Sequence, residues 1–173
     1  MPITRHTQDG FSLIEVLIAV VVISVGFLAT ARMQIESLRG SQGAYFTSQA
    51  NFMVREMTDR MRANPDGVIN GHYNNIVTSA GAAGNTPSCI NAETLCSNQE
   101  IAEADLAAWS KHLHADNQGA SNFIPLLPSG DSIQAAGSIN LDGATGVFTV
   151  SVSWSEVVRG TEEEQMMSVQ VYP

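Results

Sequence analysis

A single carboxylate, Glu15, lies within an apolar run that extends from Phe11 to Ala31. An ionisable group at the centre of a membrane helix costs about 2.5 kcal/mol or more, so such groups are usually paired and functional. Gly10 and Phe11 form a processing-like junction before the run, and a cut there would place a new α-amine one helical turn from Glu15. The spacing predicts an ammonium–carboxylate pair, within one chain or between neighbouring subunits. The alternative is a Glu15 side chain that reaches water at the membrane interface and has no role.

The position of this junction decides whether the apolar segment is kept. A secretory signal peptide has its cleavage site after the apolar region, so that region is discarded. Here the junction comes first, and residues 1–10 would be removed as a leader while the apolar helix stays. A helix over residues 11–31 would be about 30 Å long, which matches a single pass through the hydrocarbon core of a bilayer. Arg5 on one flank and Arg32 and Arg39 on the other leave the orientation open.

Two cysteines, Cys89 and Cys96, lie in a loop-like stretch with the sequence PSCINAETLC. Two close cysteines beside an export-type N-terminus predict a disulfide that forms in an oxidising compartment. On the loop-entropy estimate, closing so small a ring stabilises the fold by about 2.5 kcal/mol. The alternative is a pair of reduced thiols in a cytosolic chain.

No other set of residues converges on a reaction. His112 and His114 are two positions apart on an expected helix, so they point to different sides and make a poor metal pair. The chain has no G-x-S-x-G, P-loop or dinucleotide motif. Its net charge of -9, with 8 dispersed Lys and Arg residues, argues against nucleic-acid binding. We therefore expect no enzymatic activity, no metal, no cofactor and no nucleic-acid partner.

The helical pattern continues beyond the apolar run. Apolar residues recur at spacings of three and four, whereas charged residues fall on another side of the helix. The apolar positions are Phe46, Ala50, Met53, Met57 and Met61, and the charged ones are Arg55, Asp59 and Arg62. The stripe predicts a helix buried under its own head, and the alternative is a Met-rich surface for a partner.

Three glycines and one proline bear on the length of this helix. Gly26, Gly40 and Gly43 each weaken a helix by about 1 kcal/mol relative to Ala, so the helix either bends or melts there or continues through them. Pro65 disfavours helical backbone at Asn64, where we expect the helix to end. The expected organisation is a helix over residues 11–64, with 11–31 in the membrane and 32–64 as an amphipathic spine, followed by a globular head over 65–173.

The head is expected to combine a loop, a helix and a sheet. Residues 66–96 are rich in Gly, Asn, Ala, Ser and Thr and predict a long loop with at most short structure. Ser97 and Glu100 form a capping box ahead of an apolar stripe, which predicts a second helix that ends near His114. Strands over 138–141, 147–154 and 165–172, joined by the turns DGATG and VRGTEEE, predict an antiparallel sheet of three or four strands. The fold class is therefore α+β.

Three features of the head have competing interpretations. Trp109 and Trp154 lie on the apolar faces of their elements, which favours core packing over anchoring of a partner. The three glutamates at 162–164 favour a solvated hairpin turn over a site for a basic partner. The last strand, if it forms an exposed sheet edge, is a candidate site for strand addition.

The stretch Gly10–Ala19, GFSLIEVLIA, resembles the processing motif of type IV pilins and related pseudopilins. That motif combines a Gly before the cut, a Phe after it and a Glu as the fifth residue of the processed chain. The resemblance implies that a prepilin peptidase cuts after Gly10 and methylates the new terminus at Phe11, and that Glu15 is an assembly carboxylate. The long helix, variable loop and C-terminal sheet resemble the pilin plan, so the type IV pilin fold is expected.

The later motifs ADLAAWSKHL, LLPSG and VSVSW, together with the cysteine loop, are similar to a subfamily of minor pilins, the type IV pilus modification proteins. This resemblance implies a minor pilin with a single pass through the bacterial inner membrane and a periplasmic head, incorporated into the pilus at or near its tip. The implied partners are the prepilin peptidase, other minor pilins, the major pilin, the assembly platform and a tip adhesin. A minor pseudopilin of a type II secretion system is the alternative.

Overall fold

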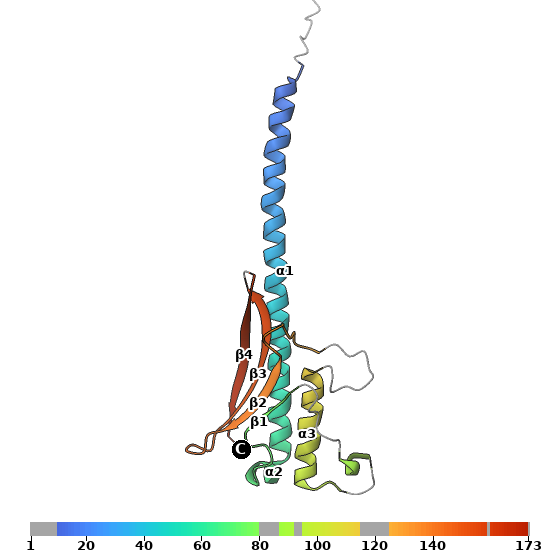
Figure 1. Cartoon of the computed structure of the whole chain (residues 1–173), viewed down its shortest axis with the longest axis vertical. Coiled ribbons are helices and arrows are strands. Elements are labelled where there is room, and N and C mark those ends of the chain that lie inside the picture. Colours follow the sequence, from blue (N-terminus) through green and yellow to red (C-terminus); the bar gives the residue numbers. More distant parts are fainter. Residues whose placement is uncertain (1–9, 80–86, 92–94, 115–124, 159, 173) are drawn as a thin grey trace, which may run out of the picture. The chain divides into compact units, whose positions relative to one another are not determined.

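The computed structural model describes residues 10–79, 87–91, 95–114, 125–158 and 160–172 (Figure 1). The expected leader, apart from Gly10, lies outside the described residues. The chain has two compact units, residues 1–42 and residues 43–173. Helix α1, Leu13–Ala63, is the element that belongs to both, and its residues are helical at Gly26, Gly40 and Gly43. The interpretation in which the helix melts at these glycines is therefore wrong.

In the first unit, every described residue is exposed. Phe11 and Leu13 expose 85% and 86% of their surface, and the other apolar side chains of this unit that the structure describes are exposed as well. Among the described residues, α1 is the one helix long and apolar enough to cross a membrane. Exposed apolar side chains on this scale are found where lipid or another protein covers them.

The second unit contains an antiparallel sheet with the strand order β1-β2-β3-β4 (Figure 1). The strands are β1, Ile76–Val77, β2, Ala136–Leu141, β3, Phe148–Val158, and β4, Thr161–Val171. The expected α+β fold, with a long N-terminal helix and an antiparallel sheet, is confirmed. The short strand β1 lies inside the expected loop and was not predicted as part of the sheet.

Three further helical segments complete the described part of the head. They are α2, Pro65–Ile69, a 3-10 turn η1, Ser88–Asn91, and α3, Asn98–Leu113. Helix α3 begins as the sequence predicts, because the Ser97 side chain accepts from the Glu100 backbone and the Glu100 carboxylate accepts from the Ser97 backbone.

One face of the sheet packs on α1 and α3. The alternation in β3 puts Phe148, Val150, Val152 and Trp154 on that face, and all four are buried. Met53, Met57 and Met61 of α1 and Trp109 of α3 meet them in the core. The core interpretation of the Met stripe and of both tryptophans is thus confirmed.

The β2 strand approaches α3 closely at Gly137. A Cβ atom built there would lie 2.5 Å from Cη2 of Trp109 and 2.8 Å from Cδ1 of Leu113. Those distances are too short for any side chain, so this glycine lets the indole ring pack directly on the backbone of β2.

The glutamates at 162–164 were predicted as a hairpin turn, and this prediction is wrong. All three lie inside β4, opposite Val157, Glu156 and Ser155 of β3. Glu162 is not simply solvated, since its carboxylate accepts from the backbone N–H of Ile133 at 2.9 Å and from the Ser155 hydroxyl at 3.0 Å. Its place in β4 holds the Glu162 carboxylate toward the segment before β2, where it accepts hydrogen bonds from the backbone of Ser132 and Ile133.

Candidate functional site

The predicted processing and assembly residues lie at the start of α1. Gly10 and Phe11 precede the helix and are exposed, and no heavy atom outside its own neighbourhood lies within 4 Å of a Cβ built at Gly10. Glu15 is in the first helical turn, where its N–H donates to the Ser12 carbonyl at 3.0 Å. The three residues therefore sit together on a short exposed segment that another protein can reach.

The electrostatics of this segment favour a carboxylate. The first turn of a helix presents unpaired backbone N–H groups and carries a partial positive charge, which stabilises an acidic side chain. Glu15 is the acidic residue of the first turn of α1. The N-terminus of α1 therefore offsets part of the free-energy cost of a charged Glu15 in an apolar environment, even without a cationic partner.

Two hydroxyl groups lie further along the apolar stretch, and both are bonded to their own helix. Ser24 Oγ donates to the Val20 carbonyl at 2.7 Å, and Thr30 Oγ1 donates to the Phe27 carbonyl at 2.9 Å. A polar group without a partner is costly in hydrocarbon. These bonds make both side chains compatible with a lipid environment.

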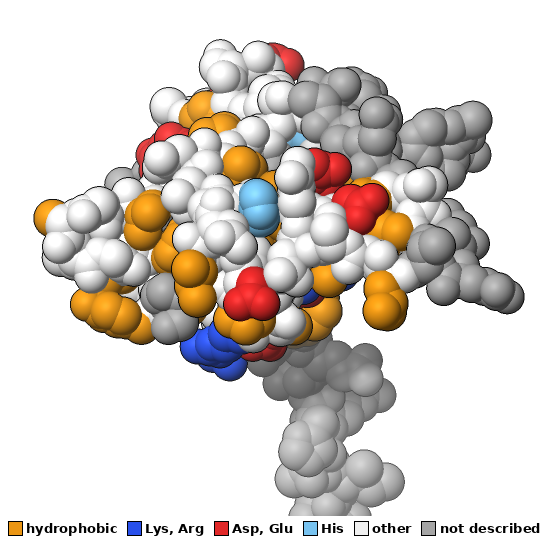
Figure 2. All heavy atoms as spheres, turned by 90° about the horizontal axis from the view of Figure 1, so that it is seen from below, with side chains coloured by type: hydrophobic (Ala, Val, Ile, Leu, Met, Phe, Trp, Pro, Cys, Tyr) orange, Lys and Arg blue, Asp and Glu red, His pale blue; other side chains and the backbone are white. Residues whose placement is uncertain are grey.

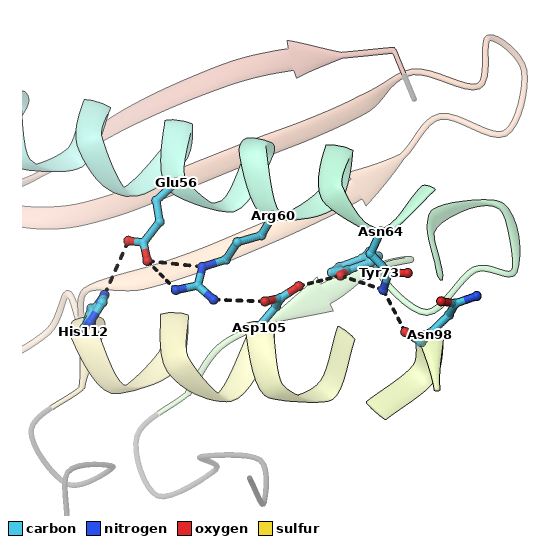
Figure 3. A network of polar contacts seen from close by, with 7 residues as sticks. All are labelled: Glu56, Arg60, Asn64, Tyr73, Asn98, Asp105 and His112. Carbon is cyan, nitrogen blue, oxygen red and sulfur yellow. Dashed lines mark hydrogen bonds and ion pairs between the residues drawn. The ribbon is translucent and has the colours of Figure 1, made fainter. Parts of the chain in front are cut away.

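In the head, a set of polar side chains joins α1 to α3 (Figure 3). At its centre, Arg60 of α1 donates to Asp105 Oδ1 of α3 at 2.9 Å and to Glu56 Oε1 at 2.8 Å. Asp105 Oδ2 accepts from the hydroxyl of Tyr73 at 2.7 Å. The Arg60 guanidinium is thus held between two carboxylates on two helices, and the phenol satisfies the second oxygen of Asp105.

The same set continues to the two ends of α3. Asn64 Nδ2 donates to the Asn98 carbonyl at 2.7 Å, and Asn64 Oδ1 accepts from the Gly67 N–H at 3.2 Å. At the other end His112 Nδ1 lies 3.6 Å from Glu56 Oε2. The Asn64 side chain therefore caps the start of α2 and bonds the first residue of α3.

The pKa values of this set follow from burial and from its charges. Burial, and then the hydrogen bond to Asp105, raise the pKa of Tyr73 well above its ordinary value. For Arg60, burial lowers the pKa, but the hydrogen bonds and charges of Glu56 and Asp105 outweigh it and raise the pKa overall. At neutral pH the phenol is therefore neutral and the guanidinium charged, which suits a structural link between helices.

Sequence reasoning did not find this set. Its members come from positions far apart in the chain, and the contact between Arg60 and Asp105 spans 45 residues. One signal was available, because Asp105 falls on the buried side of α3 with Ala102 and Trp109. A lone acidic residue on an apolar helix face indicates a buried partner.

The histidines that were judged a poor metal pair have separate surroundings. His112 faces Glu56, whereas His114 Nε2 lies 3.0 Å from the Thr78 hydroxyl. Among the residues that the structure describes, no group of three or more His, Cys, Asp or Glu side chains is placed to hold a metal ion.

The expected disulfide is present between Cys89 and Cys96. It connects η1 to the residue that precedes the N-cap of α3, and Cys89 is buried. The bond therefore ties the long connection after β1 to the start of α3.

Two comparisons with protein-family models bear on the whole arrangement. Residues 5–31 match the prokaryotic N-terminal methylation motif, and this segment contains Gly10, Phe11 and Glu15. Residues 32–107, from the middle of α1 into α3, match the family described as type IV pilin Tt1218. Over these residues the chain is similar to type IV pilins. Searches among curated proteins and among solved structures found no match.

The similarity to pilins bears on the N-terminal segment and on the helices. The pilin family is a structural, non-enzymatic protein family. The apolar stretch of α1 and the methylation motif fit a membrane-anchored protein that enters a pilus. The motif also implies contact with a prepilin peptidase and with pilus components.

Proposed function

We propose that this pilin-like protein is a minor pilin that takes part in type IV pilus assembly. It acts in a priming complex with other minor pilins in the inner membrane and lies at or near the tip of the pilus. The observation that carries the proposal is the adjoining pair of matches, a methylation motif over 5–31 and a type IV pilin model over 32–107. The similarity of its later motifs to the type IV pilus modification protein PilV supports the minor-pilin role.

Processing is the first step of the proposed function. The prepilin peptidase cuts after Gly10 and methylates the α-amine of Phe11. The exposure of both residues, and the open space around Gly10, support access by the peptidase. After the cut, residues 11–31 remain as a single membrane pass, residues 32–64 form the spine and residues 65–173 form a periplasmic head.

Glu15 is the assembly residue. Its position in the first turn of α1, near Phe11 in the sequence, supports a pairing with the amine that processing creates. An ammonium group of one subunit and the carboxylate of its neighbour attract strongly in an apolar setting. That attraction sets the register in which subunits join each other, the major pilin and the assembly platform, and a tip adhesin binds to the assembled complex.

The mature N-terminus tests the processing step directly. Mass spectrometry of the chain purified from its own bacterium should give a mass that begins at a methylated Phe11. An intact Met1, or a chain that begins at Gly10, would contradict every pilin-type function.

A deletion tests the assembly role. Loss of the chain should abolish surface pili and twitching motility while type II secretion continues, and expression of the intact chain should restore them. The reverse result, normal pili with failed secretion, would assign the chain to a type II secretion pseudopilus instead.

A further inference from the structure

The last strand of the sheet has one unpaired edge. The strand order places β4 at the margin of the sheet, and its 11 residues pair with β3 from Thr161 to Val171. Among the described residues, no backbone hydrogen bond outside the ladder involves β4. The other margin is formed by β1, which has only 2 residues. A long strand with free N–H and C=O groups is a template for a further strand.

This edge runs beside the C-terminal part of α1. Met167, Val169 and Val171 point toward the core side of the sheet, as their pairing with Val152, Val150 and Phe148 shows. Next to Val169 lies an open hollow of about 250 Å³, whose other walls are Arg55, Thr58, Asp59 and Arg62 of α1. A strand added to β4 would therefore point alternate side chains into this hollow.

A smaller apolar pocket adjoins the hollow. It has a volume of about 90 Å³ and is lined by Met61, Arg62, Pro65, Val68, Phe148 and Val171. Arg62 belongs to both, so the two cavities are neighbours at the end of β4. We call the edge of β4 with these two cavities the β4 groove. Figure 2 views the head from its end and shows basic side chains beside hydrophobic ones at one edge of that face.

The two ends of the β4 groove differ in charge. At the Val171 end, Arg62 is 61% exposed and pairs with Asp59 at 3.3 Å. Arg55, which donates to the neutral Asn51, lies in the wall of the hollow beside Val169. The walls of the hollow thus contain two guanidinium groups and one carboxylate. At the other end, Glu163 and Glu164 are exposed, and Glu163 lies directly opposite Glu156 of β3. Like charges in opposite positions destabilise a sheet, and a cation would relieve them.

We propose that the β4 groove binds an extended segment of a partner protein as a fifth strand. The segment runs antiparallel to β4, which is the more stable pairing. It has an aliphatic side chain and a carboxylate at its N-terminal end, beside the pocket and Arg62, and a basic residue at its C-terminal end, beside Glu156 and Glu163. About eight residues cover this length of strand. This binding does not depend on processing at Gly10.

A synthetic peptide tests the proposal on the full chain in detergent micelles. The probe is acetylated and amidated, with leucine and glutamate first, alternating valine and threonine next, and lysine last. We expect saturable binding in calorimetry. We also expect slower hydrogen exchange at alternate amides of residues 163–171, because only strand addition pairs those groups. Binding that leaves β4 exchange unchanged would overturn the proposal.

Two variants and a second peptide distinguish binding that depends on charge complementarity from non-specific binding. Arg62→Glu should weaken binding about tenfold, whereas Arg39→Glu, which changes the net charge equally outside the groove, should have no effect. A peptide with its glutamate and lysine exchanged should bind the intact chain about tenfold more weakly. Equal affinity for the two peptides, or equal loss in the two variants, would overturn the predicted polarity.

The oligomeric state gives an independent check. Light scattering of the micellar chain without peptide should show one copy per micelle, with fast exchange at the β4 edge. A dimer whose β4 amides are already protected would show that a second copy of this chain occupies the edge, and would overturn the proposal of a partner segment.

Discussion

Glu15 is a carboxylate surrounded in sequence by apolar residues, in a helical stretch whose described residues are exposed. The helix terminus provides part of its stabilisation, and in the proposed assembly a second charge provides the rest. The proposed source of that charge is the amine of Phe11, which exists only after cleavage. Processing and assembly are then linked through one residue pair.

The Glu15→Ala variant tests this link. It should still insert in the membrane and be cleaved, because those steps involve the apolar run and Gly10, but it should not support surface pili. Piliation is measured by sheared-pilus yield and cleavage by mass spectrometry. Glu36→Ala, which removes the next carboxylate along α1, is the matched control and should keep normal piliation. Normal piliation in Glu15→Ala would show that this carboxylate is dispensable.

Tyr73 shows how one buried hydroxyl supports the head. Removing it in Tyr73→Phe leaves an oxygen of buried Asp105 without this donor and should lower the free energy of unfolding by about 1 to 2 kcal/mol. Urea unfolding followed by tryptophan fluorescence measures the change. Tyr172→Phe removes an exposed hydroxyl that donates to the Thr145 carbonyl, and should change stability by less than about 0.5 kcal/mol. Equal effects in both variants would contradict a special role for the buried phenol.

At the residue scale, local patterns predicted the side chains whose role depends on their neighbours in sequence. The Met residues of α1 recur at helical spacing, so their burial on one face follows from the helix itself. The capping pair of α3 lies three residues apart, so its hydrogen bonds also follow from local helical geometry. The Arg60–Asp105–Tyr73 contacts were not predictable in this way, because they depend on how α1, α3 and the segment before β1 meet in space.

The close packing of α3 on β2 depends on the absence of a side chain at Gly137. In the Gly137→Ala variant the methyl group would overlap the Trp109 indole, a rigid ring that cannot move without displacing α3. We expect a loss of about 1 to 3 kcal/mol in the free energy of unfolding, measured by urea titration. Gly143→Ala, in the turn between β2 and β3 with open space around it, is the control. A Gly137→Ala head as stable as the control would show that α3 can shift freely.

The elements also show where sequence patterns fail. Helix α3 was predicted at its observed start because a capping box is a local signal. Strand β1 was missed, since 2 residues carry no alternation and are extended only through pairing with β2. The glutamates of β4 were assigned to a turn because charge suggests solvent. Their place in the ladder is set by the pairing with β3, which the local sequence does not encode.

The whole molecule is acidic, with a net charge of -9, and several of its carboxylates stabilise the fold in their charged form. A backbone hydrogen bond from Ile133, the largest cause, lowers the pKa of Glu162 below its ordinary 4.5. Bonds from Ser97 do the same for Glu100, and bonds from Thr145 and Ala144 lower the pKa of Asp142 below 3.8. A lowered pKa in the folded state means stability that is present above the ordinary value.

Acid should therefore weaken the head. The thermal midpoint of the full chain should be constant above about pH 5 and fall as the pH drops below 4.5 through the lowered values. In Glu162→Gln the midpoint at neutral pH should be a few degrees lower, and its fall with acid should be smaller. Differential scanning calorimetry measures both, with Glu163→Gln as the control, since that exposed neighbour should not reduce the acid dependence. An unchanged acid profile in Glu162→Gln would rule out this carboxylate as a source of the pH dependence.

The bonds of Ser24 and Thr30 to their own helix bear on the transfer of a subunit from the bilayer to a filament. Both hydroxyls donate to carbonyls of their own helix, so these hydrogen bonds move with the helix. Neither hydroxyl loses a partner when the helix leaves the lipid, and neither needs a new partner in a helix bundle. The move becomes an exchange of one apolar contact surface for another, with little difference in solvation. The energetic cost of drawing a subunit out of the membrane would then come from the loss of lipid contacts and from the transfer of Glu15. It would not come from broken hydrogen bonds of the helix.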